Sequence, residues 1–197
     1  MNKAYFIPLS KDNAFSVIYG QRSLSRAKWS ISSISNFFIL FFSPFLSIRL
    51  FENRYFQSRL IILKELKRLN FDLYSIKVSI SHNKNCFIAL LSKKDVKMAV
   101  DHEHCERYIS SALINRISKI KKPNSLSSVG YINILETIIK ISNIKWQFIM
   151  KDAQIREIIG LKDMYVTNLG KETIYSRFYS YNDNQICISS DKLEMLK

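Results

Sequence analysis

Residues 76–103 read IKVSISHNKNCFIALLSKKDVKMAVDHE, and apolar residues alternate with polar ones through much of this segment. A period of two is typical of a half-buried β-strand, and a short continuous apolar run is typical of a fully buried one. The segment therefore predicts strands over residues 76–82, 86–91 and 96–103, joined by turns at 83–85 and 92–95. We expect these strands to form an antiparallel meander.

Helical periodicity appears on both sides of this segment. Apolar residues recur every three or four positions over 54–69 and 131–142, and a basic helix is expected over 107–122. A period of two returns over 145–150, 164–167, 173–180 and 185–190. The chain is thus predicted to be an α+β protein with antiparallel sheets and packed helices, in an N-terminal lobe of residues 1–75 and a C-terminal lobe of residues 76–197.

The composition describes a basic protein that can fold. The 197 residues include 30 Lys or Arg against 16 Asp or Glu, for a net charge of +14, and 47% are hydrophobic. Such a charge favours a polyanionic ligand, an anionic surface or an acidic protein partner, without choosing among them. With only 4 glycines, the sequence has neither G-x-G-x-x-G nor a Walker A motif, which excludes those two kinds of nucleotide site.

The cysteines and the N-terminus indicate a cytoplasmic protein. The 3 cysteines are odd in number and scattered, unlike a disulfide scaffold, and residues 1–8 lack the pattern of a secretory signal. The most hydrophobic stretch, residues 37–48, is shorter than the ~18 apolar residues that span a bilayer. We therefore expect a buried segment there, with membrane association as the alternative.

Acidic residues gather where the third predicted strand ends. Asp101 and Glu103 are two residues apart, so both carboxylates project from the same face of the strand. With Glu136 on the helix that follows, they form a set of hard oxygen ligands suited to Mg²⁺. Each residue also has a simpler interpretation: Glu136 and Lys140 are spaced as a surface helix pair, and His82 fits a hydrogen-bonded core histidine.

Arg59 lies within the apolar arc of the first predicted helix. A guanidinium on a core-facing surface needs a partner. One interpretation is that Arg59 extends to solvent or meets a carboxylate of another segment. The other is that it forms an anion site where this helix meets its neighbour.

Four short motifs occur in a characteristic order. These are Ser58-Arg59 with Lys64, Ile80-Ser81-His82-Asn83, Ala99-Val100-Asp101-His102-Glu103, and Glu136 with Lys140. Their order, over about residues 54–190, resembles that of the 4′-phosphopantetheinyl transferases of the surfactin-synthetase-activating type. The chain departs from the family pattern at Leu135 and Ile132, where Lys and Trp are usual, and it lacks the Gly-Lys-Pro loop between the first two motifs.

The resemblance implies a ligand set. Coenzyme A is expected between the two lobes, with its 3′-phosphate near Ser81, His82 and Arg59, and with Lys64 among the residues that bind it. Mg²⁺ is expected on Asp101, Glu103 and Glu136, with Lys140 holding the same phosphates.

The resemblance also implies a reaction. Glu136 is expected to take the proton of a serine in an acyl or peptidyl carrier protein, directly or through water, and Lys140 is the second catalytic residue. The serine attacks the β-phosphate, receives the phosphopantetheine arm, and releases adenosine 3′,5′-bisphosphate. Such carrier proteins are acidic, which suits a partner of charge +14, and we expect the transferase to act as a monomer.

Three other hypotheses remain open at this point. The first is a catalytically weak homologue that binds a carrier protein or a nucleotide. The second is a nucleic-acid-binding domain, to which the charge and the basic-aromatic stretch 175–179 point, although no recognisable motif accompanies them. The third is a zinc site in the run Asp101-His102-Glu103-His104-Cys105, where His102 with His104 could bind the ion. The two histidines face away from Asp101 and Glu103, however, and no distant Cys or His pair completes a tetrahedral site.

Overall fold

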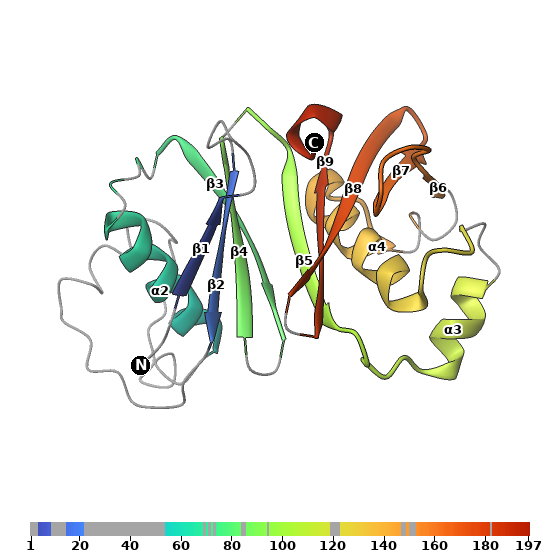
Figure 1. Ribbon diagram of the computed structural model, residues 1–197, viewed down its shortest axis with the longest axis horizontal. Coiled ribbons are helices and arrows are strands. Elements are labelled where there is room, and N and C mark those ends of the chain that lie inside the picture. Colours follow the sequence, from blue (N-terminus) through green and yellow to red (C-terminus); the bar gives the residue numbers. More distant parts are fainter. Residues whose placement is uncertain are drawn as a thin grey trace.

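The computed structural model describes residues 4–8, 15–21, 54–68, 70, 72, 74–83, 86–93, 95–118, 123–146, 149, 153–181 and 183–197. It is an α+β protein with two antiparallel sheets (Figure 1). The first sheet has the strand order β1-β2-β4-β3, with β1 Ala4–Pro8, β2 Phe15–Gln21, β4 Cys86–Lys93 and β3 Ile76–His82. The second has the order β5-β9-β8-β7-β6, with β5 Met98–His104, β9 Asn184–Ser190, β8 Glu172–Tyr181, β7 Met164–Leu169 and β6 Gln154–Glu157.

Helix α2, Arg54–Arg68, covers one face of the first sheet. Its residues Ile62 and Leu66 are four apart, so they lie on the same side of the helix and pack against Phe87, Ala89 and Leu91 of β4. The predicted helix over 54–69 is therefore confirmed to within one residue.

Helix α4, Ser128–Ser142, covers the outer face of the second sheet, with α3, Ser111–Ser118, beside it. The α4 helix begins where the Ser127 side chain accepts a hydrogen bond from the backbone of Gly130, and ends at Asn143, which adopts a left-handed conformation. Ile134 and Ile138 are completely buried in the core beneath the helix. The burial of these two residues, four apart, decides which face of α4 points toward the second sheet.

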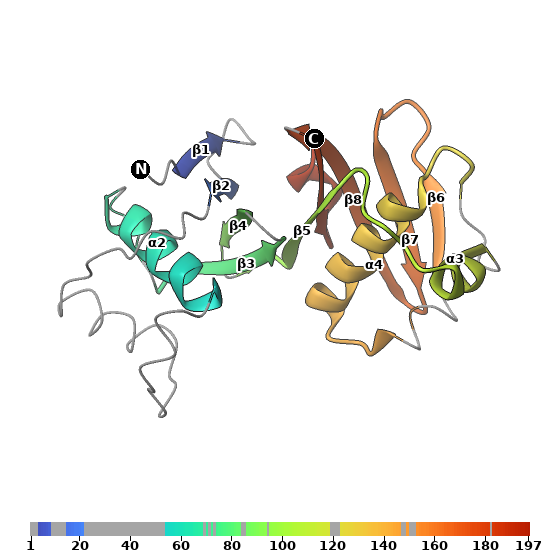
Figure 2. The same ribbon diagram turned by 90° about the horizontal axis from the view of Figure 1, so that it is seen from below.

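The inner faces of the two sheets pack together. Residues Ile88 and Leu90 of β4 point away from α2 and share a core with Val100 of β5 and Ile188 of β9. The first sheet thus lies between α2 and the second sheet, and α4 packs on the face of the second sheet that points away from β4. Figure 2 shows from below that the second sheet curves around α4. Strand β4 is apolar on both faces because both of its faces are covered.

The two sheets also meet along their edges, where β3 lies beside β5. The backbone amides of Val100 and His102 donate hydrogen bonds to the side-chain oxygens of Ser79 and Ser81, both at 3.1 Å. In an ordinary sheet these amides of an edge strand would meet another strand's carbonyl groups. Two serine side chains take that place here, so the sheets touch without merging.

The predicted three-stranded meander is wrong in its last step. Strands β3 and β4 pair as expected, but β5 leaves the first sheet and pairs with β9. Its apolar face packs over β4 instead of continuing the ladder, because Ile88 and Leu90 need cover on that side. The sheets therefore divide the chain between Lys93 and Met98, later than the expected lobe boundary after residue 75.

Two other predicted elements differ from the structure. The strand expected over 145–150 is helical at Trp146 and Ile149, and the amide of Ile149 bonds to the carbonyl of Lys145. A window of six residues fits either period, so it cannot separate the two structures. The basic helix expected over 107–122 starts later, since α3 spans Ser111–Ser118, and residues 119–122 of the prediction lie outside the described residues.

The later strands agree with their predictions. Strands β7, β8 and β9 contain the predicted segments 164–167, 173–180 and 185–190. Strands β1, β2 and β6 were not predicted. The hydrophobic segment 37–48 lies outside the described residues, and within them no helix is both long and apolar enough to cross a membrane.

Candidate metal centre

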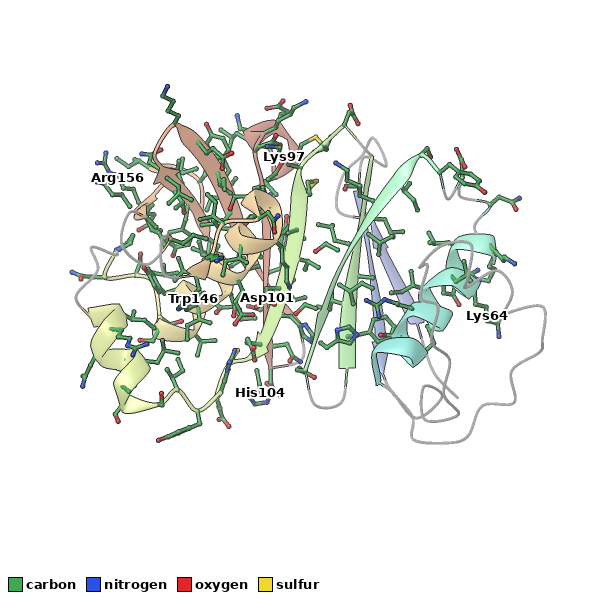
Figure 3. The ribbon with its side chains drawn as sticks, turned by 180° about the vertical axis from the view of Figure 1, so that it is seen from behind. Lys64, Lys97, Asp101, His104, Trp146 and Arg156 are labelled. Atoms are coloured by element: carbon green, nitrogen blue, oxygen red, sulfur yellow. The ribbon has the colours of Figure 1, made fainter. Side chains whose placement is uncertain are left out.

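Three carboxylates from two elements converge between β5 and α4. Asp101 and Glu103 project from the same face of β5, and Glu136 comes from the middle of α4. One carboxylate oxygen of each lies within 4.8 Å of one of each of the others. Figure 3 shows Asp101 on β5, next to the helix. The predicted set of oxygen ligands is therefore brought together by the fold.

Asp101 is the buried member of this cluster, with 2% of its surface exposed. Its Oδ1 atom accepts hydrogen bonds from the Ser81 hydroxyl at 2.7 Å and from the Lys140 ammonium at 3.0 Å. Its Oδ2 atom is buried and has no hydrogen-bond partner in the described part of the chain. A buried carboxylate oxygen without a partner is costly, and a bound cation would satisfy it.

Lys140 is held in place by two acceptors. Besides Asp101, its ammonium group donates to the backbone carbonyl of Val100 at 2.8 Å. About a third of the side chain stays exposed. The lysine lies one helical turn after Glu136, so the helix presents both groups to the same strand.

A second cation, Arg107, contacts the same cluster. Its Nη1 atom forms an ion pair with Glu103 and lies 3.8 Å from the Glu136 carboxylate. The arginine follows β5 in a turn where its backbone amide bonds to the carbonyl of His104. Sequence reasoning missed this contact, because residue 107 was expected to start a helix and no pattern signals where a turn directs a side chain.

Burial shifts the protonation of the two glutamates. Burial, reinforced by the negative charge of Asp101, raises the pKa of Glu136 to about 7 despite the opposing effect of Arg107. Burial also raises the pKa of Glu103, against the lowering effect of Arg107. The cluster therefore holds protons more readily than exposed glutamates do.

Hydrogen bonds join the four motifs in sequence. Ser58 of α2 bonds to the His82 imidazole at 2.6 Å, and Ser81, the neighbour of His82, bonds to Asp101. Asp101 in turn bonds to Lys140. Residues from the first, second, third and fourth motifs are thus in direct contact, each with the next.

Not all of the predicted site residues reach the carboxylate cluster. Ser81 points toward β5, whereas His82 alternates to the other side of β3 and meets α2. Arg59 is partly buried on α2 next to Ser58. Lys64 is exposed on α2, and Figure 3 places it well away from Asp101.

The residues present fit a divalent cation of the Mg²⁺ type. Three carboxylates from a rigid strand and helix offer hard oxygen ligands, and the partnerless Oδ2 of Asp101 is one of them. The departures from the family pattern have a structural counterpart in α4. Leu135 and Ile132, at the places of the usual Lys and Trp, are buried in the core and supply neither a cation nor an indole to the site.

The histidines and the cysteine of the zinc hypothesis, and the basic-aromatic stretch 175–179, lie outside the carboxylate cluster. His102 is fully buried while His104 and Cys105 are exposed, and the metal-binding group found among the described residues contains none of them. In the stretch 175–179, Phe178 packs in the core, and Arg177 donates to the carbonyl oxygen of Leu196 at 2.5 Å. These side chains serve packing and a terminal contact.

A scan against protein-family models finds no match for the chain, and a search of curated proteins finds no significant similarity.

Proposed function

We propose that this protein is a Mg²⁺-dependent 4′-phosphopantetheinyl transferase with the two-lobed fold of that family. Its substrates are coenzyme A and the serine hydroxyl of an acidic acyl or peptidyl carrier protein. The proposal rests on one observation: the carboxylates Asp101, Glu103 and Glu136 lie together with Lys140 beside them. These are the residues that the motif order assigns to metal and phosphate.

The contacts between motifs support the same proposal. Short motifs that match by chance have no reason to touch, whereas here Ser58 contacts His82, Ser81 contacts Asp101, and Asp101 contacts Lys140. The site also lies where β3 of the first sheet meets β5 of the second. That position suits a ligand bound between two lobes.

Each residue has a defined task in the proposed reaction. Asp101, Glu103 and Glu136 would hold Mg²⁺, which when bound neutralises the pyrophosphate of coenzyme A. Lys140 donates to the same phosphates, and Ser81 keeps the Asp101 carboxylate in position. His82 and Arg59 lie on the first sheet and α2, where they would face the 3′-phosphate.

The bond changes balance without a further reactant. The serine oxygen of the carrier forms a bond to the β-phosphorus, and the bond from that phosphorus to the bridging oxygen breaks. Adenosine 3′,5′-bisphosphate leaves with the bridging oxygen. The hydroxyl proton passes to Glu136, directly or through a water molecule. Fixed positions and opposite charge supply most of the rate enhancement.

Transfer of a label tests the proposal. The purified protein is incubated with Mg²⁺, fluorophore-labelled coenzyme A and a panel of acidic apo-carrier proteins, and labelled carrier is detected by gel fluorescence. We expect Asp101→Asn and Glu136→Gln to reduce labelling at least about 100-fold. Asn is preferred to Ala at 101 because its oxygen can still accept from Ser81 and Lys140, which preserves the fold.

The control is Asp95→Asn, which removes an exposed carboxylate outside the cluster and should keep full activity. Circular dichroism establishes that each variant is folded. If the folded wild-type protein labels no carrier, the transferase proposal is rejected. Titration with coenzyme A then identifies a catalytically weak homologue by binding without transfer.

A further inference from the structure

We propose that Arg107 is an internal counter-ion of the carboxylate cluster, which a divalent cation must displace in order to bind. The inference rests on the metal site of the proposed function and concerns how that site is regulated. It assigns a role to a residue outside the four motifs.

The charges of the metal-free cluster are nearly balanced by the protein itself. Three carboxylates face two cations, Lys140 at Asp101 and Arg107 at Glu103 and Glu136. Arg107 is the cation that serves both glutamates through a single nitrogen atom, Nη1. That atom therefore lies within ion-pair distance of both carboxylates.

The two cations are held differently. Lys140 also donates to a backbone carbonyl, which fixes it whether or not a metal is present. In the described part of the chain, the Arg107 guanidinium contacts only Glu103 and Glu136, and 37% of its side chain is exposed. Its backbone is anchored in the turn after β5, so the side chain can swing toward solvent without moving the strand.

A metal and Arg107 compete for the same place. A divalent ion bound to both glutamates would sit about 2.1 Å from their oxygens, and it would need the Glu103 oxygen that Nη1 now contacts. A guanidinium and a divalent cation a few ångströms apart also repel each other. Metal binding therefore includes the cost of breaking the Arg107 ion pairs.

Metal affinity measured without coenzyme A or carrier tests the proposal. Binding of Mn²⁺ is followed by the loss of its free-ion electron paramagnetic resonance signal. We expect Arg107→Gln to bind Mn²⁺ about three- to tenfold more tightly than the wild-type protein, because the competing charge is gone. Arg68→Gln is the matched control: it removes the same charge from an exposed pair with Glu65 and should leave affinity unchanged.

A melting experiment gives an independent readout. With chelator, Arg107→Gln should melt at a lower temperature than the wild-type protein, since it leaves the carboxylates without their counter-ion. With saturating Mg²⁺ the difference should disappear. An equal loss under both conditions would mean that Arg107 is only a structural contact, and the proposal would be overturned.

The outcomes separate the two proposals. Equal or weaker Mn²⁺ binding by folded Arg107→Gln overturns the proposed role of Arg107 but does not contradict the proposed metal site. No Mn²⁺ binding by either protein rejects the metal site of the proposed function, and this inference with it. If Arg107→Gln does not fold, Arg107→Lys replaces it, because lysine keeps the charge but cannot contact both glutamates as the guanidinium does. Arg107→Lys should bind Mn²⁺ more tightly than the wild-type protein. Equal or weaker binding then overturns the proposal.

Discussion

Glu136 links the charge of the cluster to the stability of the fold. Burial and the negative charge of Asp101 raise its pKa from the ordinary value of 4.5 to about 7. Between these two values the folded protein binds more protons than the unfolded chain. The free energy of unfolding contributed by this group therefore falls as pH rises from about 4.5 to about 7.

This sign gives a testable pH dependence for the metal-free protein. Measured with chelator between pH 5 and 8, the melting temperature of the wild-type protein should fall relative to that of Glu136→Gln as pH rises, because the variant has no carboxylate to ionise. Glu103 has a raised pKa as well and acts in the same direction. A difference between the two proteins that does not change with pH would contradict the assignment.

The two described cysteine side chains differ in reactivity for a physical reason. Cys105 is exposed, whereas Cys187 is fully buried in the second sheet, and burial raises the pKa of its thiol to about 12. In a Cys86→Ser background, one thiol should react with a disulfide reagent at pH 8 under native conditions, and both in denaturant. Rapid native modification of Cys187 would contradict its position in the core.

At the scale of elements, helices with clear end signals or a wide apolar face were predictable. The α2 helix has buried residues at helical spacing, and Ser142 was correctly predicted as the end of α4. Its start was predicted at Tyr131, although the Ser127 cap sets it three residues earlier. The segment 145–150 was assigned the wrong period because six residues are too few to distinguish strand from helix.

The contact between β3 and β5 is the element-scale feature that positions the site. The Ser81 hydroxyl accepts a hydrogen bond from the His102 amide and donates one to the Asp101 carboxylate. Removing the hydroxyl therefore takes a hydrogen-bond partner from each of these two buried groups. We expect Ser81→Ala to lower the free energy of unfolding by about 1–3 kcal/mol, and Ser79→Ala by less, since Ser79 serves only the Val100 amide.

Urea denaturation of both variants measures these losses. Ser75→Ala provides the control, because its hydroxyl bonds to a carbonyl in an exposed turn and its loss should cost less than about 0.5 kcal/mol. Equal stability of Ser81→Ala and the wild-type protein would show that the edge contact does not hold the two sheets together.

At the scale of the whole molecule, the inner core joins the two lobes. Ile88 of the first sheet packs with Val100 and Ile188 of the second, and all three are completely buried. A shared core of this kind predicts that the sheets unfold together. The candidate metal centre therefore depends on the first sheet as well as on the second.

A core substitution tests this coupling. Ile88→Ala should lower the free energy of unfolding by about 2–5 kcal/mol, through lost burial and a cavity, while Ile114→Ala at the exposed surface of α3 should have little effect. Far-ultraviolet circular dichroism and tryptophan fluorescence should report a single coincident transition. Two separate transitions would show that the lobes fold independently.

From the chain alone one predicts the α+β class, the helix over 54–69, the hairpin of β3 and β4, and the shared face of Asp101 and Glu103. Each follows from local spacing, which places side chains on one face of a strand or helix. Packing in three dimensions sets the rest: β5 leaves the first sheet, Glu136 joins the two carboxylates of β5, Ser81 faces Asp101 while His82 faces α2, and Arg107 reaches the glutamates. These features depend on which apolar surfaces cover one another, and packing between distant segments leaves no periodic pattern in the chain.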